Sequence, residues 1–483
     1  MKKPYLLIIF AVVCTLVTSA QSRGRHLVAF KDWQTTGQSH LEYQKPIACP
    51  LNPIIKADNP WELNAKGDPY AAPFSGGVYH DDADGKFKMW YSAGGGRVDG
   101  LVTCYAESTD GIHWIKPELD VVPGTNIVDT LEQDCVTVLL DKWAKDPAKR
   151  FKMFCVAFNK PSSVSMVLKY SPDGIHWDEP VALSGELHDR CSAYYDPFQG
   201  KYVISLKTIH PELRRARAYL AHEDPELAVS LAHRVYHGKQ DKFIRYWFNA
   251  DSLDQRHPKF PEIRPQIYNH DAMPYERGLL GQFVVWQGPE NDMCNKLAIQ
   301  KRNEIMLGWS DDGFNWIRPD RTAFVAVNDS VPGAWNAGNI QSVAGNPVIV
   351  GDSLYFYYSG RYESKPTHAS NFATGLSTLR RDGFAALTGK GTATSPAFAI
   401  EGSNLHINVD CRIAPLTIQL LSPDDSILAT YKIPKGINST DYLGGTLPAS
   451  LMDAPTSPSG EKLIRLRVIN PGSASLYSYW TDN

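Results

Sequence analysis

The sequence lacks the features of several common protein classes. Its formal net charge is only −3 over 483 residues, so no excess of basic charge favours nucleic acid or an acidic membrane surface as a partner. It has no Cys-x-x-Cys and no His-Glu-x-x-His motif, and it therefore gives no reason to expect a bound metal ion or another cofactor. Beyond residue 20, no apolar run is long enough to span a membrane.

Cysteines are few, and their spacing shows no pairing. Seven of the eight follow residue 20, at positions 49, 104, 135, 155, 191, 294 and 411. An odd number without paired spacing argues against a disulfide framework in a chain of this length, although a single bridge remains open.

The N-terminus has the pattern of a secretory signal peptide over residues 1–20. Lys2 and Lys3 precede an apolar run over residues 6–17, and small residues follow up to Ala20. Cys14 follows Val13 rather than the small residue that a lipoprotein signal prefers, so we expect release rather than a lipid anchor. The sequence predicts a periplasmic or secreted protein, with an irregular leader over residues 21–45.

What the sequence does have is a repeated turn. Residues 108–114 read Ser-Thr-Asp-Gly-Ile-His-Trp, residues 171–177 read Ser-Pro-Asp-Gly-Ile-His-Trp, and residues 310–316 read Ser-Asp-Asp-Gly-Phe-Asn-Trp. A partial copy at residues 377–384 keeps Asp-Gly-Phe but loses the tryptophan. The starts lie 63, 139 and 67 residues apart, so the middle interval holds two periods, and a degenerate copy begins at Ala221.

Asp-Gly is a tight-turn signal, and five such units predict an all-β chain. We expect a five-bladed β-propeller over residues 46–388, with each repeated turn closing the outer hairpin of a blade. We expect the aspartates of the turns (110, 173 and 312), together with His113 and His176, to be structural.

The pattern changes after residue 388. Short alternating segments separated by Asp, Gly and Pro indicate antiparallel strands, and residues 389–483 therefore predict a C-terminal β-sandwich. This region offers no cluster of chemically active residues. It is either a stabilising appendage or a sugar-binding module.

Carboxylates precede or begin the first strands of three consecutive blades. They are Asp134 in blade two, Asp189 in blade three, and Asp271 with Glu276 in blade four. The leading residues of these strands face the mouth of a propeller's central channel, where substrates bind. Cleavage of a glycosidic bond needs one carboxylic acid and one carboxylate, and neighbouring carboxylates raise one another's pKa. Asp271 is also interpretable as a cap or turn residue.

Other polar and aromatic side chains fall at the same blade positions. Amides, arginines and aromatic rings are suited to recognising sugar hydroxyls and rings. Arg215 and Arg217 share one face of a strand, where they either clamp an anionic group or pair with the acids. The predicted binding residues are Arg190, Arg215, Arg217, His270, Asp271, Tyr275, Trp335, Asn339 and Gln341.

Several of these stretches together resemble a known group of proteins. The matching stretches are residues 77–91, the repeated turn, residues 189–192, residues 215–219, Tyr275-Glu276 and residues 379–384. On them, residues 50–483 resemble secreted bacterial proteins related to glycoside hydrolase families 32 and 43, often labelled as having a family 32 N-terminal domain.

The resemblance implies a five-bladed propeller glycosidase with an Asp, Asp, Glu set. These residues act there as nucleophile or base, transition-state stabiliser and general acid, and matching by order gives Asp134, Asp189 and Glu276. The chain departs from the families in two respects. Their first Asp lies on blade one, where this chain has Ser75-Gly76-Gly77, and the Trp-Met-Asn-Asp-Pro signature of family 32 is absent, so fructan cleavage is not supported.

The sequence therefore predicts a secreted glycoside hydrolase that cleaves a terminal bond of a poly- or oligosaccharide. Glu276 is the predicted acid, Asp134 the base or nucleophile, and Asp189 the residue that orients the sugar and tunes the acid. The expected partner is a carbohydrate, and no oligomeric state is indicated.

Three alternatives stay open. A glycoside phosphorylase would hold phosphate with Arg190, Arg215, Arg217 and His270. A sialidase is suggested by the likeness of the repeated turn to an Asp-box, although sialidases use six blades. A non-catalytic glycan-binding protein is the third.

Overall fold

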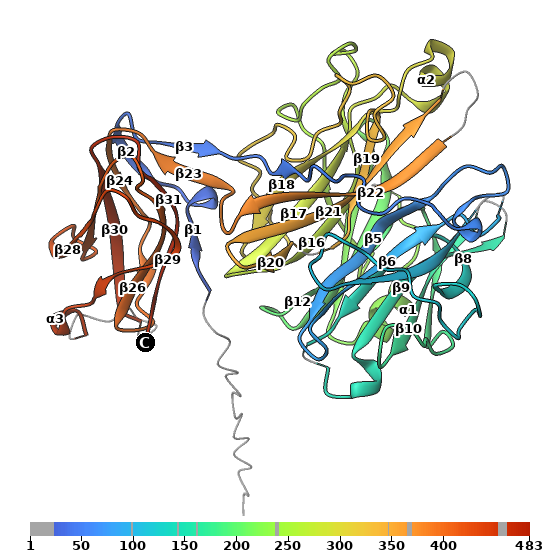
Figure 1. Ribbon diagram of the computed structural model, residues 1–483, viewed down its shortest axis with the longest axis horizontal. Coiled ribbons are helices and arrows are strands. Elements are labelled where there is room, and N and C mark those ends of the chain that lie inside the picture. Colours follow the sequence, from blue (N-terminus) through green and yellow to red (C-terminus); the bar gives the residue numbers. More distant parts are fainter. Residues whose placement is uncertain are drawn as a thin grey trace, which may run out of the picture.

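The computed structural model describes residues 24–97, 100–142, 144–160, 163–236, 241–345, 347–364, 370–452 and 461–483. The structure is all-β, as the sequence predicts, with 53% strand and 6% helix (Figure 1). The predicted signal peptide lies outside the described residues. None of the helices in the described ranges is long and apolar enough to cross a membrane.

Most strands between residues 47 and 380 form five consecutive groups. The first is β5 (Ala71–Asp81), β6 (Lys86–Ala93) and β7 (Leu101–Ser108). The second is β8 (Ile127–Leu140), β9 (Phe151–Lys160), β10 (Ser163–Ser171) and β11 (Ala182–Leu187). The third is β12 (Ser192–Asp196), β13 (Lys201–His210), β14 (Arg214–His222) and β15 (Arg245–Asn249). The fourth is β16 (Gln266–Tyr275), β17 (Gly278–Trp286) and β18 (Asn303–Ser310). The fifth is β19 (Asn339–Val343), β20 (Val348–Val350), β21 (Ser353–Glu363) and β22 (Ser370–Arg380), joined by β4 (Ile47–Ala48).

The first strands of the five groups follow one another in a ring. β5 contacts β8, β8 contacts β12, β12 contacts β16, β16 contacts β19, and β19 returns to β5. Strand ladders connect neighbouring groups at the β7–β8 and β18–β19 pairs. In the described chain no sheet closes on itself, so side-chain packing rather than a continuous ladder completes the ring.

The repeated Asp-Gly turns are built alike. In the first copy, the Asp110 carboxylate accepts hydrogen bonds from the backbone N–H groups of Ile112 and His113, both at 2.8 Å. The hydroxyl of Ser108 accepts from the N–H of Gly111 at 2.9 Å. The other two full copies repeat the carboxylate contacts through Asp173 and Asp312. These aspartates are therefore structural, as predicted.

The turns also connect neighbouring groups. The Trp90 indole of the first group donates to the carbonyl of Gly174 in the second group's turn at 2.6 Å. Tyr194 of the third group donates in the same way to Gly313 of the fourth at 3.2 Å. Tyr357 of the fifth group donates to Gly111 of the first at 2.7 Å. The last of these bonds joins the end of the ring to its beginning.

Gly174 illustrates why the turn needs glycine, and it gives a first prediction. Its φ is +82°, and a Cβ added there would lie 2.4 Å from the buried ring of Trp90. We expect Gly174→Ala to lower the free energy of unfolding by about 3 kcal/mol, from left-handed strain and overpacking together. Gly200→Ala is the control, because φ is +67° there but no atom lies within 4 Å of the added Cβ.

The two variants separate strain from packing. Gly200→Ala should cost about 1 kcal/mol, the strain contribution alone. The measurement is urea unfolding of both variants and the wild type. Equal losses in the two variants would show that Gly174 is not packed against Trp90.

The C-terminal region consists of two sheets around one core. One sheet has the order β29-β26-β31-β23-β3 with β1 on β31, and the other has β2-β24-β30-β27-β28 with β25 on β30. Buried apolar residues of both sheets, among them Leu405, Ile418, Leu466 and Leu476, form a single cluster. The strands are β23 (Ala385–Thr388), β24 (Gly391–Thr394), β25 (Phe398–Ala399), β26 (Asn404–Asp410), β27 (Leu416–Leu421), β28 (Ile427–Ile433), β29 (Asn438–Thr446), β30 (Leu463–Asn470) and β31 (Ser475–Asp482).

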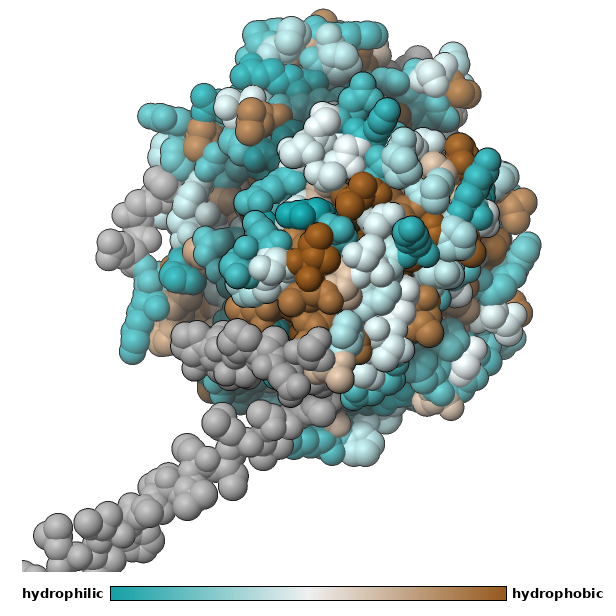
Figure 2. All heavy atoms as spheres, turned by 90° about the vertical axis from the view of Figure 1, so that its left-hand side faces the viewer, coloured by the Kyte–Doolittle hydropathy of each residue, from teal (hydrophilic) through white to brown (hydrophobic). Residues whose placement is uncertain are grey.

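The outer surface of this region is mixed in character. Figure 2 shows teal and white atoms over most of it, with some brown atoms near the middle. The exposed apolar side chains of the region include Ile413, Ile427 and Leu443.

The expected irregular leader is wrong from residue 26 onwards. β1 (His26–Leu27), β2 (Gln34–Gly37) and β3 (His40–Tyr43) are strands of the two C-terminal sheets, and η1 (Val28–Phe30) is a buried 3-10 turn. β23 belongs to these sheets as well, so the boundary falls near residue 384 rather than 388. β2 and β3 are only four residues long, and each is stabilised as a strand by pairing with a strand distant in the chain, β24 and β23 respectively.

The remaining elements are short. α1 (Pro225–Leu231) follows the degenerate copy of the turn that begins at Ala221, the third in chain order, and packs on β10, β11, β13 and β14. α2 (Asn291–Leu297) lies between β17 and β18, and α3 (Ala449–Met452) follows β29. The 3-10 turns η2 (Pro60–Glu62) and η3 (Pro147–Lys149) precede β5 and β9. All seven cysteines in the described ranges are free.

Candidate active site

A polar cleft of about 320 Å³ opens at one end of the ring. The strand pairing brings several strand ends together here. Gln266 of β16 pairs with Trp286, and Trp286 pairs with Asn303. Asn303 in turn lies beside Asn339, which pairs with Arg361. The cleft therefore lies along the edge where the leading strands begin. Its lining residues are Asp189, Arg190, Arg215, Tyr268, Asn291, Cys294, Asn295, Gln300, Lys301, Asn339, Gln341, Arg361 and Glu363.

Asp134 lies directly behind Arg190. The register of β8 against β9 shifts between Gln133 and Cys135, so Asp134 is the extra residue of an irregularity in the strand. Its carboxylate accepts a hydrogen bond from the backbone N–H of Arg190 at 3.0 Å, and its side chain is 11% exposed. Burial raises the pKa of Asp134 above its ordinary value, the nearby charge of Asp189 adds to this, and Arg190 acts in the opposite sense.

Asp189 lies just before β12 with a side chain 40% exposed to the cleft. It forms an ion pair with Lys207 of β13, and Arg190 Nε lies 4.0 Å away. Burial works against ionisation, but the Lys207 and Arg190 charges outweigh it and hold the pKa of Asp189 below its ordinary value. The two neighbouring carboxyl groups are thus shifted in opposite directions.

Arg190 joins the two carboxylates in a left-handed backbone conformation with φ +61°. Such a conformation is uncommon outside glycine, and it persists here because several contacts hold the residue. Its Nη1 donates to the carbonyl of Asp134 at 2.9 Å, and its guanidinium lies 4.1 Å above the ring of Phe74. The Arg190 carbonyl in turn accepts from Arg217 at 2.9 Å.

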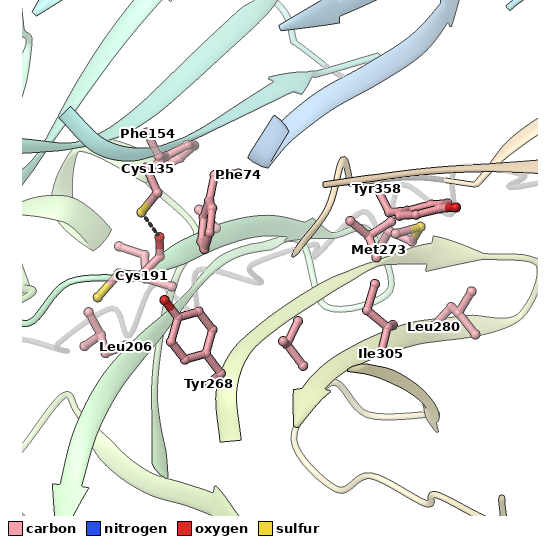
Figure 3. Packing of buried hydrophobic residues seen from close by; sticks show 14 of the residues in the cluster. Phe74, Cys135, Phe154, Cys191, Leu206, Tyr268, Met273, Leu280, Ile305 and Tyr358 are labelled. Atoms are coloured by element: carbon pink, nitrogen blue, oxygen red, sulfur yellow. Dashed lines mark hydrogen bonds between the residues drawn. The ribbon is translucent and has the colours of Figure 1, made fainter. Parts of the chain in front are cut away.

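The residues beneath Asp134 and Arg190 are buried and closely packed. Phe74, Cys135, Cys191 and Tyr268 belong to one buried cluster (Figure 3). The Cys135 thiol donates to the carbonyl of Cys191 at 3.3 Å, and these cysteines directly follow Asp134 and Arg190 in the chain. The positions of the site residues are therefore set by the core.

Arg215 and Arg217 have different surroundings. Arg217 is fully buried and bonds Ser205 and the Arg190 carbonyl, so it positions Arg190 and does not line the cleft. Arg215 lines the cleft, with its guanidinium 4.7 Å from the ring centre of Trp286. The predicted clamp of two arginines is not formed.

Three cleft residues carry charges that sequence reasoning missed. Lys301 Nζ lies 4.2 Å from the ring centre of Tyr268 and 4.3 Å from that of Trp286. The Arg361 guanidinium lies 4.6 Å from the ring centre of Phe372, and Glu363 lies 3.5 Å from the same guanidinium. The sequence contains only weak indications of these residues, because Lys301 lies in the loop after α2 and Arg361 lies near the end of the aromatic strand β21.

Two predicted amides also line the cleft. Asn339 Oδ1 accepts a hydrogen bond from Asn303 at 2.7 Å, and the Gln341 amide donates to the Tyr268 hydroxyl at 3.4 Å. Asn339 Nδ2 is buried without a partner in the described chain. These amides can therefore still bind a hydroxyl or an anion.

Glu276 does not lie in the cleft. Tyr275 pairs with Gly278, so Glu276 and Arg277 form the two-residue loop between β16 and β17, at the opposite end of β16 from Tyr268. Glu276 follows Tyr268 by eight positions along the strand, which corresponds to about 26 Å. The Glu276 carboxylate instead accepts from the backbone N–H of Arg25 at 2.8 Å and from Arg381 at 3.2 Å.

The predicted set of Asp134, Asp189 and Glu276 is therefore not assembled. The prediction placed Glu276 at the head of an inner strand, but that strand begins ten residues earlier, at Gln266. Tyr275 is also distant from the cleft, because its hydroxyl donates to the buried Asp382 at 2.5 Å. Both residues belong to the contact with the C-terminal sheets.

His270 and Trp335 are packing residues. His270 is fully buried among aromatic rings, with ring centres of Trp247, Phe283 and Trp316 within 5 Å. Neither of its nitrogens has a hydrogen-bond partner in the described structure, and burial holds its pKa well below the ordinary value. Trp335 stacks on Tyr358 with ring centres 5.9 Å apart. Neither side chain lines the cleft.

Asp271 lines a second cavity of about 200 Å³, which lies between the leading strands β5, β8, β12 and β16. Its carboxylate accepts from Asn269 and from Ser342, each at 3.1 Å. Burial raises the pKa of Asp271 to about 6.

This shift gives a pH-dependent prediction. A raised carboxyl pKa favours the protonated native state, so the contribution of Asp271 to stability is largest near pH 4 and is lost as the pH rises to about 6. The loss is about 3 kcal/mol. We expect the stability difference between Asp271→Asn and wild type to shift in favour of the variant by that amount over this interval. Denaturant unfolding at pH 4, 5, 6 and 7 measures it, and a difference independent of pH would contradict the prediction.

No metal-binding cluster is apparent. Within the described ranges, no group of three or more His, Cys, Asp or Glu side chains is placed to hold a metal ion.

The sequence matches no protein-family model and no curated protein. Solved structures with a similar arrangement include an N-acetylgalactosamine deacetylase from F. plautii in complex with blood group B trisaccharide, at 12% identity over 72% of this chain and 96% of that one, with a TM-score of 0.47. A β-1,2-mannobiose phosphorylase from Listeria innocua is 12% identical over 71% of this chain and 98% of that one, also at 0.47.

A further similar structure belongs to the GH130 family, which is described as mannoside phosphorylases that include glycoside hydrolases acting on β-1,2 mannosidic linkages in Candida mannan. It is 16% identical over 70% of this chain and 94% of that one, at a TM-score of 0.45. The similarity is too low to support a conclusion about activity. The evidence for function comes from the residues of the cleft.

Proposed function

We propose that the ring of five strand groups is a five-bladed β-propeller and that the C-terminal sheets form a β-sandwich. The ring of contacts from β5 through β19 supports this, as do the bonds from Trp90, Tyr194 and Tyr357 to the turns of the next group. A propeller holds its blades together through packing, so open sheets agree with this architecture. Its ligands bind at the mouth of the ring, where the cleft lies.

We propose that the protein is a glycoside hydrolase and that the cleft is its active site. The observation that carries this proposal is the pair of adjacent carboxyl groups, Asp134 and Asp189, with pKa values shifted in opposite directions. Glycosidases require one carboxylic acid and one carboxylate, and unequal environments assign those roles. Asp134 is the general acid, and Asp189 is the nucleophile or base. This assignment replaces Glu276.

The surroundings suit a saccharide. Amides from Asn339, Gln341 and Gln300 and the hydroxyl of Tyr268 offer hydrogen bonds to sugar hydroxyls. The cleft volume of about 320 Å³ accommodates one or two sugar rings, which favours action at a chain end. With the predicted signal peptide, the site of action is the periplasm or the cell exterior.

The experiment that tests this proposal is a screen of an oligosaccharide panel, neutral and acidic, with wild type and Asp189→Asn. We expect release of a terminal sugar by the wild type and not by the variant. Thermal unfolding of both proteins shows whether the variant is folded. Release that is equally fast with Asp189→Asn would place the active site elsewhere, and binding without release in either protein would support a glycan-binding protein.

Phosphorolysis is a second candidate, favoured by the cations that line the same cleft. In that reaction inorganic phosphate, rather than water, attacks the anomeric carbon. The screen is therefore run with and without phosphate. A sugar phosphate as product, formed only when phosphate is present, would replace hydrolysis by phosphorolysis.

A further inference from the structure

The cleft holds more positive charge than its acids neutralise. Among its carboxylates, Asp189 pairs with Lys207 and Glu363 lies by Arg361, while Arg190 lies between Asp189 and the carboxyl group of Asp134 behind the cleft. Arg215 and Lys301 remain. In the described part of the chain, neither has a carboxylate within ion-pair distance.

Aromatic rings support both of these cations from one side. Arg215 and Lys301 lie over the ring of Trp286, at 4.7 and 4.3 Å from its centre. Such contacts offset part of the cost of burial but leave the N–H groups free to bind a ligand. Burial, followed by the charges of Arg215, Arg190 and Arg361, lowers the pKa of Lys301 well below its ordinary value.

Three of the residues that line the cleft also carry unpaired donors. Arg215 Nη1, Arg361 Nε and Asn339 Nδ2 are buried and have no hydrogen-bond acceptor among the described residues. A buried polar group without a partner costs free energy, and a charged one costs more. An anion bound here would satisfy these donors and relieve the repulsion between the cations.

We propose that Arg215, Lys301 and Arg361, with the amide of Asn339, form a subsite for an oxyanion. The forked donors of arginine suit the oxygens of carboxylate, sulfate or phosphate groups, and Lys301 adds a point charge. The oxyanion comes from one of two sources, an acidic substituent of the saccharide (a uronate carboxylate or a sulfate ester) or free inorganic phosphate. This inference rests on the proposed function, since it gives that cleft its substrate class.

The first test is direct binding, which does not depend on turnover. Isothermal titration calorimetry of the full chain compares inorganic phosphate, glucuronate and glucose. We expect at least one of the two anions to bind and glucose to bind far more weakly. Arg215→Gln and Lys301→Met should each weaken anion binding by 10-fold or more. The matched control is Lys242→Met, because Lys242 also lies over an aromatic ring, 5.2 Å from the centre of Phe243, but outside the cleft.

Thermal unfolding provides a second readout. Lys301→Met replaces a buried amine, which pairs with no carboxylate in the described chain, by an apolar side chain beside Trp286, so the free variant should unfold at a higher temperature than the wild type. The bound anion should raise the Tm of the wild type and of Lys242→Met but not that of Lys301→Met. A Tm that falls in Lys301→Met, together with unchanged anion binding, would overturn the subsite.

Turnover then identifies the source of the oxyanion. Cleavage of a uronate- or sulfate-bearing oligosaccharide without phosphate would assign the subsite to the saccharide, and cleavage of a neutral one only with phosphate would assign it to phosphate. Either result supports the subsite.

Other results would overturn the subsite and leave the proposed function standing. They are that neither anion binds, and that a neutral oligosaccharide is cleaved without phosphate and equally well by Lys301→Met. Anion binding without any turnover would reject the proposed function alone.

Discussion

Replacement of Asp134 by Asn is expected to lower kcat on a natural oligosaccharide by about 10²- to 10⁴-fold, the usual contribution of a general acid. Asp134 is buried behind Arg190, and burial raises its pKa above the ordinary value of an aspartate, the direction that a general acid requires. Asparagine keeps the size of the side chain and its acceptor oxygen for the Arg190 N–H, but it cannot donate an acidic proton.

The substrate and the pH dependence show whether the loss has this cause. An aryl glycoside with an acidic phenol as leaving group needs little protonation, so Asp134→Asn should cleave it with a much smaller loss. The wild-type rate should fall as the pH rises through the pKa of Asp134, and this alkaline decline should disappear in the variant. It should also fall at low pH, as Asp189 becomes protonated. An equal loss on both substrates would contradict the assignment of Asp134 as the acid.

Replacement of Asp382 by Ala is expected to lower the free energy of unfolding by about 3–5 kcal/mol. Asp382 is fully buried at the contact between the ring and the C-terminal sheets. Its carboxylate pairs with Arg25 at 3.0 Å and accepts from Ser478 at 2.6 Å as well as from Tyr275. Loss of the carboxylate leaves the buried guanidinium of Arg25 without its main counter-charge.

Denaturant unfolding measures this effect, and a paired variant checks its cause. Arg25→Met combined with Asp382→Ala removes both charges, so the double variant should be destabilised less than the sum of the two single changes. Asp425→Ala is the control, since Asp425 pairs with Arg465 at 2.6 Å on the exposed surface, where such pairs contribute little. Additive losses in the double variant would show that the buried pair is not coupled.

Local signals in the sequence were reliable, because the interactions behind them are local. The Asp-Gly turns form through contacts between residues two or three positions apart, such as those of Asp110 with Ile112 and His113. Their spacing therefore indicated the number of strand groups. The positions of Asp134 and Asp189 followed from the same repeat.

Features that depend on distant contacts were missed or misplaced. The start of β16, from Gln266 to Asp271, mixes polar and apolar residues without regular alternation, and the head of the strand was placed at Asp271 and Glu276 instead. The strand β2 has no apolar residue and β3 has only two, so both were too short to recognise without their pairing with β24 and β23. Lys301 and Arg361 both line the cleft, although they are far apart in the chain. No spacing in the sequence predicts that these two residues line the same cleft.

The central claim is that Asp134 and Asp189, and not Glu276, perform the chemistry. The most direct test compares kcat of Asp189→Asn and Glu276→Gln with wild type on one cleaved oligosaccharide, at a temperature where all three proteins are folded. We predict a loss of about 10³-fold or more for Asp189→Asn and a change of less than about threefold for Glu276→Gln, whose carboxylate accepts hydrogen bonds from Arg25 and Arg381, away from the cleft. Loss of activity in Glu276→Gln with Asp189→Asn unaffected would contradict the account.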